Sequence, residues 1–142
     1  MENAQVFFAE FPGVVLCIDD DQATLEVMES TLTGNGYSVL TSSSWRDAVE
    51  TFQQNSIDLV IVDYEMPWMN GYEVALWIRS ISPRVPIVLH SDSLDVSELA
   101  IKRTDACIPK GSEPSVLIAA VSNLIMANRE RLAGMGVSGG TK

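Results

Sequence analysis

The sequence predicts an α/β protein in which five strands form a doubly wound parallel sheet and alternate with five helices. Apolar runs such as residues 59–62 lack polar alternation, which is typical of parallel strands that are buried on both faces. Segments with apolar residues at helical spacing separate these runs, and the loops between them are short. We therefore expect a single sheet with helices on both of its faces.

The strands follow from the apolar runs. The expected strands are residues 14–18, 37–41, 58–62, 87–90 and 106–108. Pro109 lies beside the last of them, and proline is tolerated at the edge of a sheet because it removes a ladder hydrogen bond. An edge position for the fifth strand agrees with the flavodoxin-like strand order 2-1-3-4-5.

The helices follow from periodicity and from capping residues. The expected helices begin at residues 22, 45, 71, 96 and 114, and the last ends near Leu132. Asp21 is placed to cap the first helix. We expect an N-terminal extension over residues 1–13, the folded domain over 14–133 and a flexible glycine-rich tail over 134–142.

Composition excludes several classes of function. The formal net charge of −10 argues against a nucleic-acid partner, because phosphate binding depends on clustered lysine and arginine. No apolar stretch reaches the roughly 18 residues that a membrane span needs, and the N-terminus has no basic region of the secretory type. Cys17 and Cys107 fall in strand-like runs without metal-type spacing, so we expect buried thiols and a cytoplasmic location.

Polar side chains follow the strands at the edge of the sheet where open α/β folds bind ligands. Asp19 and Asp20 follow the first strand, Asp63 the third, Ser91 the fourth and Lys110 the fifth. Crowded carboxylates either gain protons or attract a cation, and an all-oxygen site open to water favours Mg²⁺. The pattern therefore predicts a magnesium site.

Asp63 lies at the centre of this array and can act as a carboxylate nucleophile towards a phosphoryl donor. The metal and the Lys110 ammonium would neutralise charge on the transferring group. The Ser91 hydroxyl would donate a hydrogen bond to a phosphoryl oxygen. These roles together predict phosphoryl transfer.

From about Val14 to Leu132 the chain resembles the receiver domains of two-component response regulators. The matching features are the pair Asp19-Asp20, the segment Asp63-x-x-Met66-Pro67-x-x-Asn70-Gly71, Ser91 and Lys110. The resemblance implies a stand-alone, chemotaxis-receiver-like response regulator, which is not an enzyme. It also implies that Asp63 accepts phosphate from a histidine kinase or phosphotransfer protein, and that the signal passes to an unknown protein target. A homodimer is left open.

The same resemblance implies the ligand roles. Asp20, Asp63 and the backbone carbonyl of Glu65 would hold Mg²⁺, and Asp19 would act mostly through water. Ser91 would move onto the phosphate and report phosphorylation to the surface.

The main alternative is a pseudo-receiver, a protein-interaction module that phosphorylation does not regulate. Asp63 and Lys110 argue against this hypothesis. Cys107, which stands where many members of the family carry an aromatic residue, and Asp92, where the family prefers a small residue, argue for it.

Two enzymatic alternatives are weaker. The run His90-Ser91-Asp92 is reminiscent of a hydrolase, but adjacent strand residues point to opposite faces, so His90 cannot act as a base for Ser91. Asp19-x-Asp21 formally fits a phosphatase of the haloacid dehalogenase type, which would leave Asp63 without a role.

Overall fold

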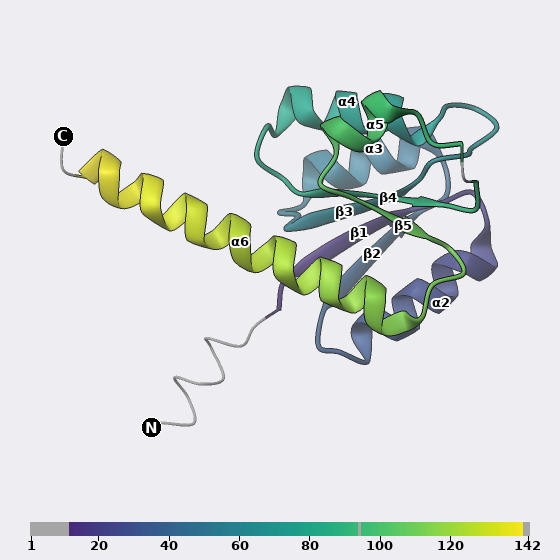
Figure 1. The fold of residues 1–142 in the computed structure, drawn as a ribbon, viewed down its shortest axis with the longest axis horizontal. Coiled ribbons are helices and arrows are strands. Elements are labelled where there is room, and N and C mark those ends of the chain that lie inside the picture. The colour runs from purple at the N-terminus through teal and green to yellow at the C-terminus, as the bar shows by residue number, and fades with distance from the viewer. Residues whose placement is uncertain (1–11, 94, 141–142) are drawn as a thin grey trace.

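The computed structural model describes residues 12–93 and 95–140. Its single sheet has five strands, all parallel, in the order β2-β1-β3-β4-β5 (Figure 1). The predicted fold class and strand order are therefore confirmed. The expected N-terminal extension lies outside the described residues over positions 1–11.

The strands agree closely with the apolar runs. They are β1 (Val14–Ile18), β2 (Ser38–Ser42), β3 (Leu59–Asp63), β4 (Ile87–Ser91) and β5 (Ala106–Pro109). β3 lies in the middle of the sheet, between β1 and β4, and all of its residues are buried. β5 lies at the edge of the sheet and pairs only with β4, so Pro109 interrupts no hydrogen bonds to a second neighbouring strand.

Helices cover both faces of the sheet. They are α2 (Gln22–Thr33), α3 (Trp45–Gln54), α4 (Gly71–Ile81), α5 (Glu98–Arg103) and α6 (Pro114–Gly140). Helices α2 and α6 lie on one face, and α3, α4 and α5 lie on the other (Figure 1). The Asp21 carboxylate accepts a hydrogen bond from the amide of Thr24, so Asp21 caps α2 as predicted.

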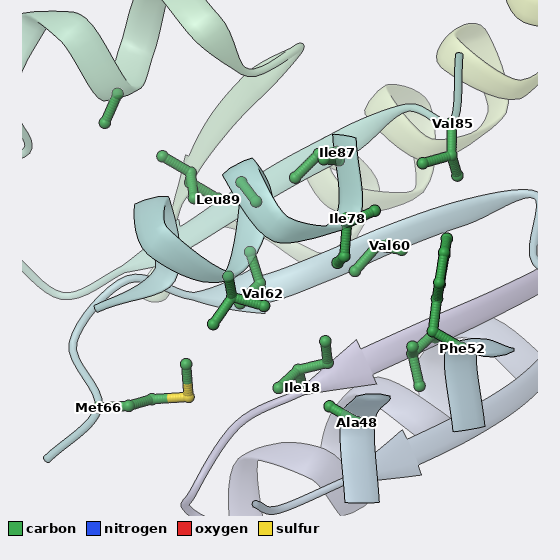
Figure 2. Packing of buried hydrophobic residues seen from close by; sticks show 14 residues of the cluster. Ile18, Ala48, Phe52, Val60, Val62, Met66, Ile78, Val85, Ile87 and Leu89 are labelled. Carbon is green, nitrogen blue, oxygen red and sulfur yellow. The ribbon is translucent and has the colours of Figure 1, made fainter. Parts of the chain in front are cut away.

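Each face of the sheet has its own hydrophobic core. Figure 2 shows one core, in which Ile18, Val60 and Val62 of the strands pack with Ala48 and Phe52 of α3. Alternate residues of the same strands face α2 and α6 in the other core. Full burial of a valine, leucine, isoleucine, phenylalanine or methionine side chain in these cores stabilises the fold by about 1.5–3 kcal/mol. The two cores explain why the strands lack polar alternation.

Two predicted helix boundaries are wrong. Helix α6 continues to Gly140, beyond the expected end near Leu132, so residues 134–140 are helical. Glycine lowers helix propensity by about 1 kcal/mol but does not prevent helical dihedral angles. Helix α5 begins at Glu98, two residues after Val96, because the Ser97 hydroxyl accepts a hydrogen bond from the amide of Ala100 and caps the helix there.

The connection between β3 and α4 passes directly over the end of the central strand. The amide of Gly71 donates to the carbonyl of Tyr64 at 2.8 Å. A Cβ atom on Gly71 would collide with the carbonyl oxygen of Asp63 and lie 2.8 Å from Cα of Tyr64. Only glycine allows α4 to begin this close to Asp63.

Candidate functional site

Three aspartates meet at the carboxyl ends of β1 and β3. Asp19, Asp20 and Asp63 each offer a carboxylate oxygen, and these oxygens all lie within 4.8 Å of one another. Asp19 is 0% exposed and Asp63 is 2% exposed, whereas Asp20 is open to solvent. The structure thus brings together the acidic residues that the sequence predicted.

Lys110 is the counterion of the two buried carboxylates. Its Nζ atom lies 3.0 Å from Oδ1 of Asp63 and 3.1 Å from Oδ2 of Asp19. The Lys110 amide donates to the carbonyl of Ser91 at 2.9 Å, which holds the residue after β5 beside the end of β4. The cluster holds three carboxylates and Lys110 pairs with two of them, so the ionised cluster retains net negative charge.

The environment of Asp63 shifts its carboxyl group towards the protonated form in the absence of a metal ion. Burial raises the pKa of its carboxyl to about 7, the charge of Asp19 acts in the same direction, and Lys110 opposes both. For Lys110, burial acts to lower the pKa, but its ion pairs with Asp63 and Asp19 outweigh this effect and raise the pKa. The ammonium group therefore stays charged.

The two oxygens of the Asp63 carboxylate have different surroundings. Oδ1 faces the Lys110 ammonium and accepts a hydrogen bond from the Glu65 amide at 3.2 Å. Among the described residues, Oδ2 makes no hydrogen bond or ion pair. One oxygen is therefore anchored and the other is left for chemistry.

The donor set fits a hard divalent cation. All three side chains offer carboxylate oxygens, and the exposed Asp20 keeps the cluster open to water. Oδ1 of Asp19 accepts from the Asp21 amide at 2.9 Å, while its buried Oδ2 faces Lys110 without a hydrogen bond of good geometry. A buried oxygen in this situation gains from a cation, because attraction between opposite charges is strong there.

Ser91 is buried at the end of β4, but its hydroxyl contacts Glu65 and not Asp63. The hydroxyl donates to Oε1 of Glu65 at 2.9 Å, and the Asp92 amide approaches the same oxygen at 3.3 Å. The sequence suggested only the backbone of Glu65. No sequence pattern reveals this side-chain contact, because it depends on how two loops approach each other.

The enzymatic alternatives find no support in the geometry. Ser91 has no hydrogen bond with His90, and Nδ1 of His90 has no hydrogen-bond partner among the described residues. Burial lowers the pKa of His90, and nearby Lys110 adds to this effect, so the imidazole is neutral. The Asp21 side chain caps α2 through Thr24 and does not serve as a second catalytic carboxylate.

Both cysteines are free thiols. Cys17 is buried in β1, and burial raises its pKa to about 12. Cys107 is half-buried, and burial followed by the charge of Glu65 raises its pKa as well. Neither thiol is activated as a nucleophile. None of the helices in the described part of the chain combines the length and hydropathy that crossing a bilayer requires.

Comparison with known proteins agrees with this site. Residues 15–122 match the family described as "Response regulator receiver domain". The autoinducer 1 sensor kinase/phosphatase LuxN of Vibrio campbellii is 30% identical over 116 residues, which cover 80% of this chain and 14% of LuxN. The regions that match this chain make up only 14% to 38% of the lengths of LuxN and two other curated relatives.

Solved structures give the same result. A response regulator receiver domain protein from Clostridium thermocellum has a TM-score of 0.76 and 31% identity, with 85% of this chain and 98% of that chain covered. The response regulator TrrA from Thermotoga maritima, solved in complex with Mg²⁺–BeF, has a TM-score of 0.74 and 29% identity over 79% of this chain and 98% of that chain. The chain therefore belongs to the family of response regulator receiver domains, which are signalling modules.

Proposed function

We propose that this chain is a response regulator receiver that accepts a phosphoryl group on Asp63 from the phosphohistidine of a histidine kinase or phosphotransfer protein. The observation that carries the proposal is the position of Asp63. Its carboxylate lies at the end of the central strand, 3.0 Å from the Lys110 ammonium and beside Asp19 and Asp20. Among the described residues, this is the only group of three acidic side chains whose oxygens lie close enough together to hold a metal ion.

The transfer forms one bond and breaks one bond. Oδ2 of ionised Asp63 attacks phosphorus, and the bond between phosphorus and the histidine nitrogen breaks. The electron pair of that bond remains on the leaving imidazole, and the product is an acyl phosphate. Lys110 stabilises negative charge on the phosphoryl oxygens, which is the main requirement of phosphoryl transfer.

Asp20, Asp63 and the backbone carbonyl of Glu65 would hold Mg²⁺, with Asp19 acting mostly through water. When bound, Mg²⁺ supplies positive charge that stabilises the phosphoryl oxygens and favours ionised Asp63. This chain's own residues then orient the nucleophile. The Lys110 ammonium and the Glu65 amide both hold Oδ1 of Asp63, which fixes the plane of the carboxylate.

The proposed setting is the cytoplasm, with signalling by protein–protein contact. The free thiols and the net charge of −10 support an intracellular protein without a nucleic-acid partner. A pseudo-receiver is the second candidate, and the engagement of the Ser91 hydroxyl by Glu65 is the observation that favours it. In a pseudo-receiver the site would accept no phosphate.

Phosphoramidate provides a direct test, because it carries a phosphorus–nitrogen bond like that of phosphohistidine. With Mg²⁺, the proposal predicts a phosphorylated species that neutral hydroxylamine cleaves, as expected of an acyl phosphate. Chelation of the metal with EDTA should slow its formation strongly. Absence of labelling at any Mg²⁺ concentration, in protein with native stability, would favour the pseudo-receiver.

A further inference from the structure

The side chain of Glu65 crosses from the β3–α4 connection to the end of β4. Its Oε1 atom accepts from the Ser91 hydroxyl at 2.9 Å and from the Asp92 amide at 3.3 Å. Two consecutive residues thus direct one hydroxyl and one amide at a single anionic oxygen. This donor arrangement suits any oxyanion, including a phosphoryl oxygen.

The backbone of Glu65 is connected to the nucleophile at the same time. Its amide donates to Oδ1 of Asp63 at 3.2 Å. The Glu65 residue is exposed, whereas Ser91 is 2% exposed, so the carboxylate covers a buried hydroxyl from the solvent side. Glu65 therefore links the phosphoacceptor strand to the loop that would sense the phosphate.

The hydroxyl of Ser91 is fully engaged in this arrangement. It has a single hydrogen to donate. The carbonyl of Ser93 lies 3.3 Å away, but the Glu65 carboxylate is nearer at 2.9 Å and is the stronger, charged acceptor. The hydroxyl oxygen in turn accepts from the Ser93 amide at 2.9 Å. Ser91 cannot donate to a phosphoryl group until it releases Glu65.

We propose that Glu65 is an internal competitor of the phosphoryl group: in the unphosphorylated protein its carboxylate occupies the two donors, Ser91 and Asp92, that phosphorylated Asp63 would use. The inference rests on the proposed function of Asp63. Phosphorylation then displaces Glu65. The displacement is opposed because Glu65 loses its hydrogen bonds with Ser91 and Asp92, and phosphorylation is opposed because the Glu65 carboxylate repels the phosphoryl group. Glu65 thereby lowers the population of the activated state.

Beryllofluoride, a phosphoryl analogue, tests this competition. We would measure its dissociation constant by tryptophan fluorescence, since Trp68 lies partly exposed in the β3–α4 connection. The comparison includes the wild type, Glu65→Gln, Glu65→Ala and the control Asp92→Asn. Mg²⁺ is kept saturating, because removal of an acidic group also weakens attraction for the metal. Urea midpoints show whether the variants keep the native fold.

Competition for the donors predicts a graded result. Glu65→Ala should bind beryllofluoride about tenfold more tightly than the wild type, which corresponds to about 1.4 kcal/mol. Glu65→Gln should lie between them, because its neutral carbonyl still accepts hydrogen bonds but more weakly. Asp92→Asn keeps the backbone amide donor, so its affinity for beryllofluoride should increase less than that of either Glu65 variant.

Two results would overturn the inference and leave the proposed function intact. One is equal affinity in the wild type and both Glu65 variants. The other is an equal increase in beryllofluoride affinity in Glu65→Gln, Glu65→Ala and Asp92→Asn, which would show that only the loss of negative charge matters. If neither the wild type nor any variant binds beryllofluoride, the proposed function itself is contradicted and this inference falls with it.

Discussion

The ammonium nitrogen of Lys110 lies 3.0 Å from Oδ1 of Asp63. The same nitrogen lies 3.1 Å from Oδ2 of Asp19, so a single cation joins the carboxyl ends of β1 and β3. Both carboxylates are buried, and desolvated charges of one sign require a counterion. Lys110 therefore has a structural role in addition to its proposed role in phosphoryl transfer.

Replacement of Lys110 by methionine keeps most of the side-chain volume and removes the charge. Without a metal ion, the free energy of unfolding should fall by about 3 kcal/mol, because two buried carboxylates lose their partner. Urea unfolding at pH 8 in EDTA measures this loss. Lys102→Met, at an exposed position of α5, should change stability by less than about 0.5 kcal/mol. Equal losses in the two variants would disprove the structural role.

The raised pKa of Asp63 predicts how stability depends on pH in the metal-free protein. Between its ordinary pKa of 3.8 and about 7, folded Asp63 retains a proton that the unfolded chain has lost. The contribution of Asp63 to the free energy of unfolding is therefore fully present below pH 3.8, decreases as the pH rises and is lost above about pH 7. Asp63→Asn should remove this dependence, so the stability difference between variant and wild type should grow with pH. Parallel curves from urea unfolding would contradict the pKa shift.

The different exposure of Asp19 and Asp20 predicts different effects on Mg²⁺ binding. Asp20→Asn should weaken binding by about tenfold or more, because it removes an exposed carboxylate that can ligate the metal directly. Asp19→Asn should weaken binding less, because Asp19 already faces Lys110 and the Asp21 amide. Mg²⁺ titrations monitored by tryptophan fluorescence compare the two. The reverse order of affinities would refute the proposed ligand roles.

Gly71 and Gly111 form a matched pair for testing the loop beside Asp63. A Cβ atom on Gly71 meets the backbone of Asp63 and Tyr64, whereas one on Gly111 has nothing within 4 Å. Gly71→Ala should lower the free energy of unfolding by about 1–3 kcal/mol, as overpacking does, and should slow phosphorylation. Gly111→Ala should leave both unchanged. Thermal unfolding and phosphoramidate labelling provide the measurements.

The sequence was sufficient to predict the sheet, because parallel strands buried on both faces require uninterrupted apolar runs. The cluster of Asp19, Asp63 and Lys110 was also predictable, since parallel topology brings strand ends to one edge. The end of α6 was not predictable, because glycine weakens a helix without ending it. The contact between Glu65 and Ser91 depends on loop conformation and side-chain rotamers, for which the sequence carries no periodic signal.

The most direct test of the central claim is intact-mass spectrometry of the protein after incubation with acetyl phosphate and Mg²⁺. The geometry of Asp63, with one oxygen anchored by Lys110 and the other without a hydrogen bond among the described residues, predicts a single added phosphate. Asp63→Asn should remain unlabelled, and Glu73→Gln, at an exposed position in α4, should label like the wild type. Persistent labelling of Asp63→Asn at the wild-type rate would show that Asp63 is not the phosphoacceptor.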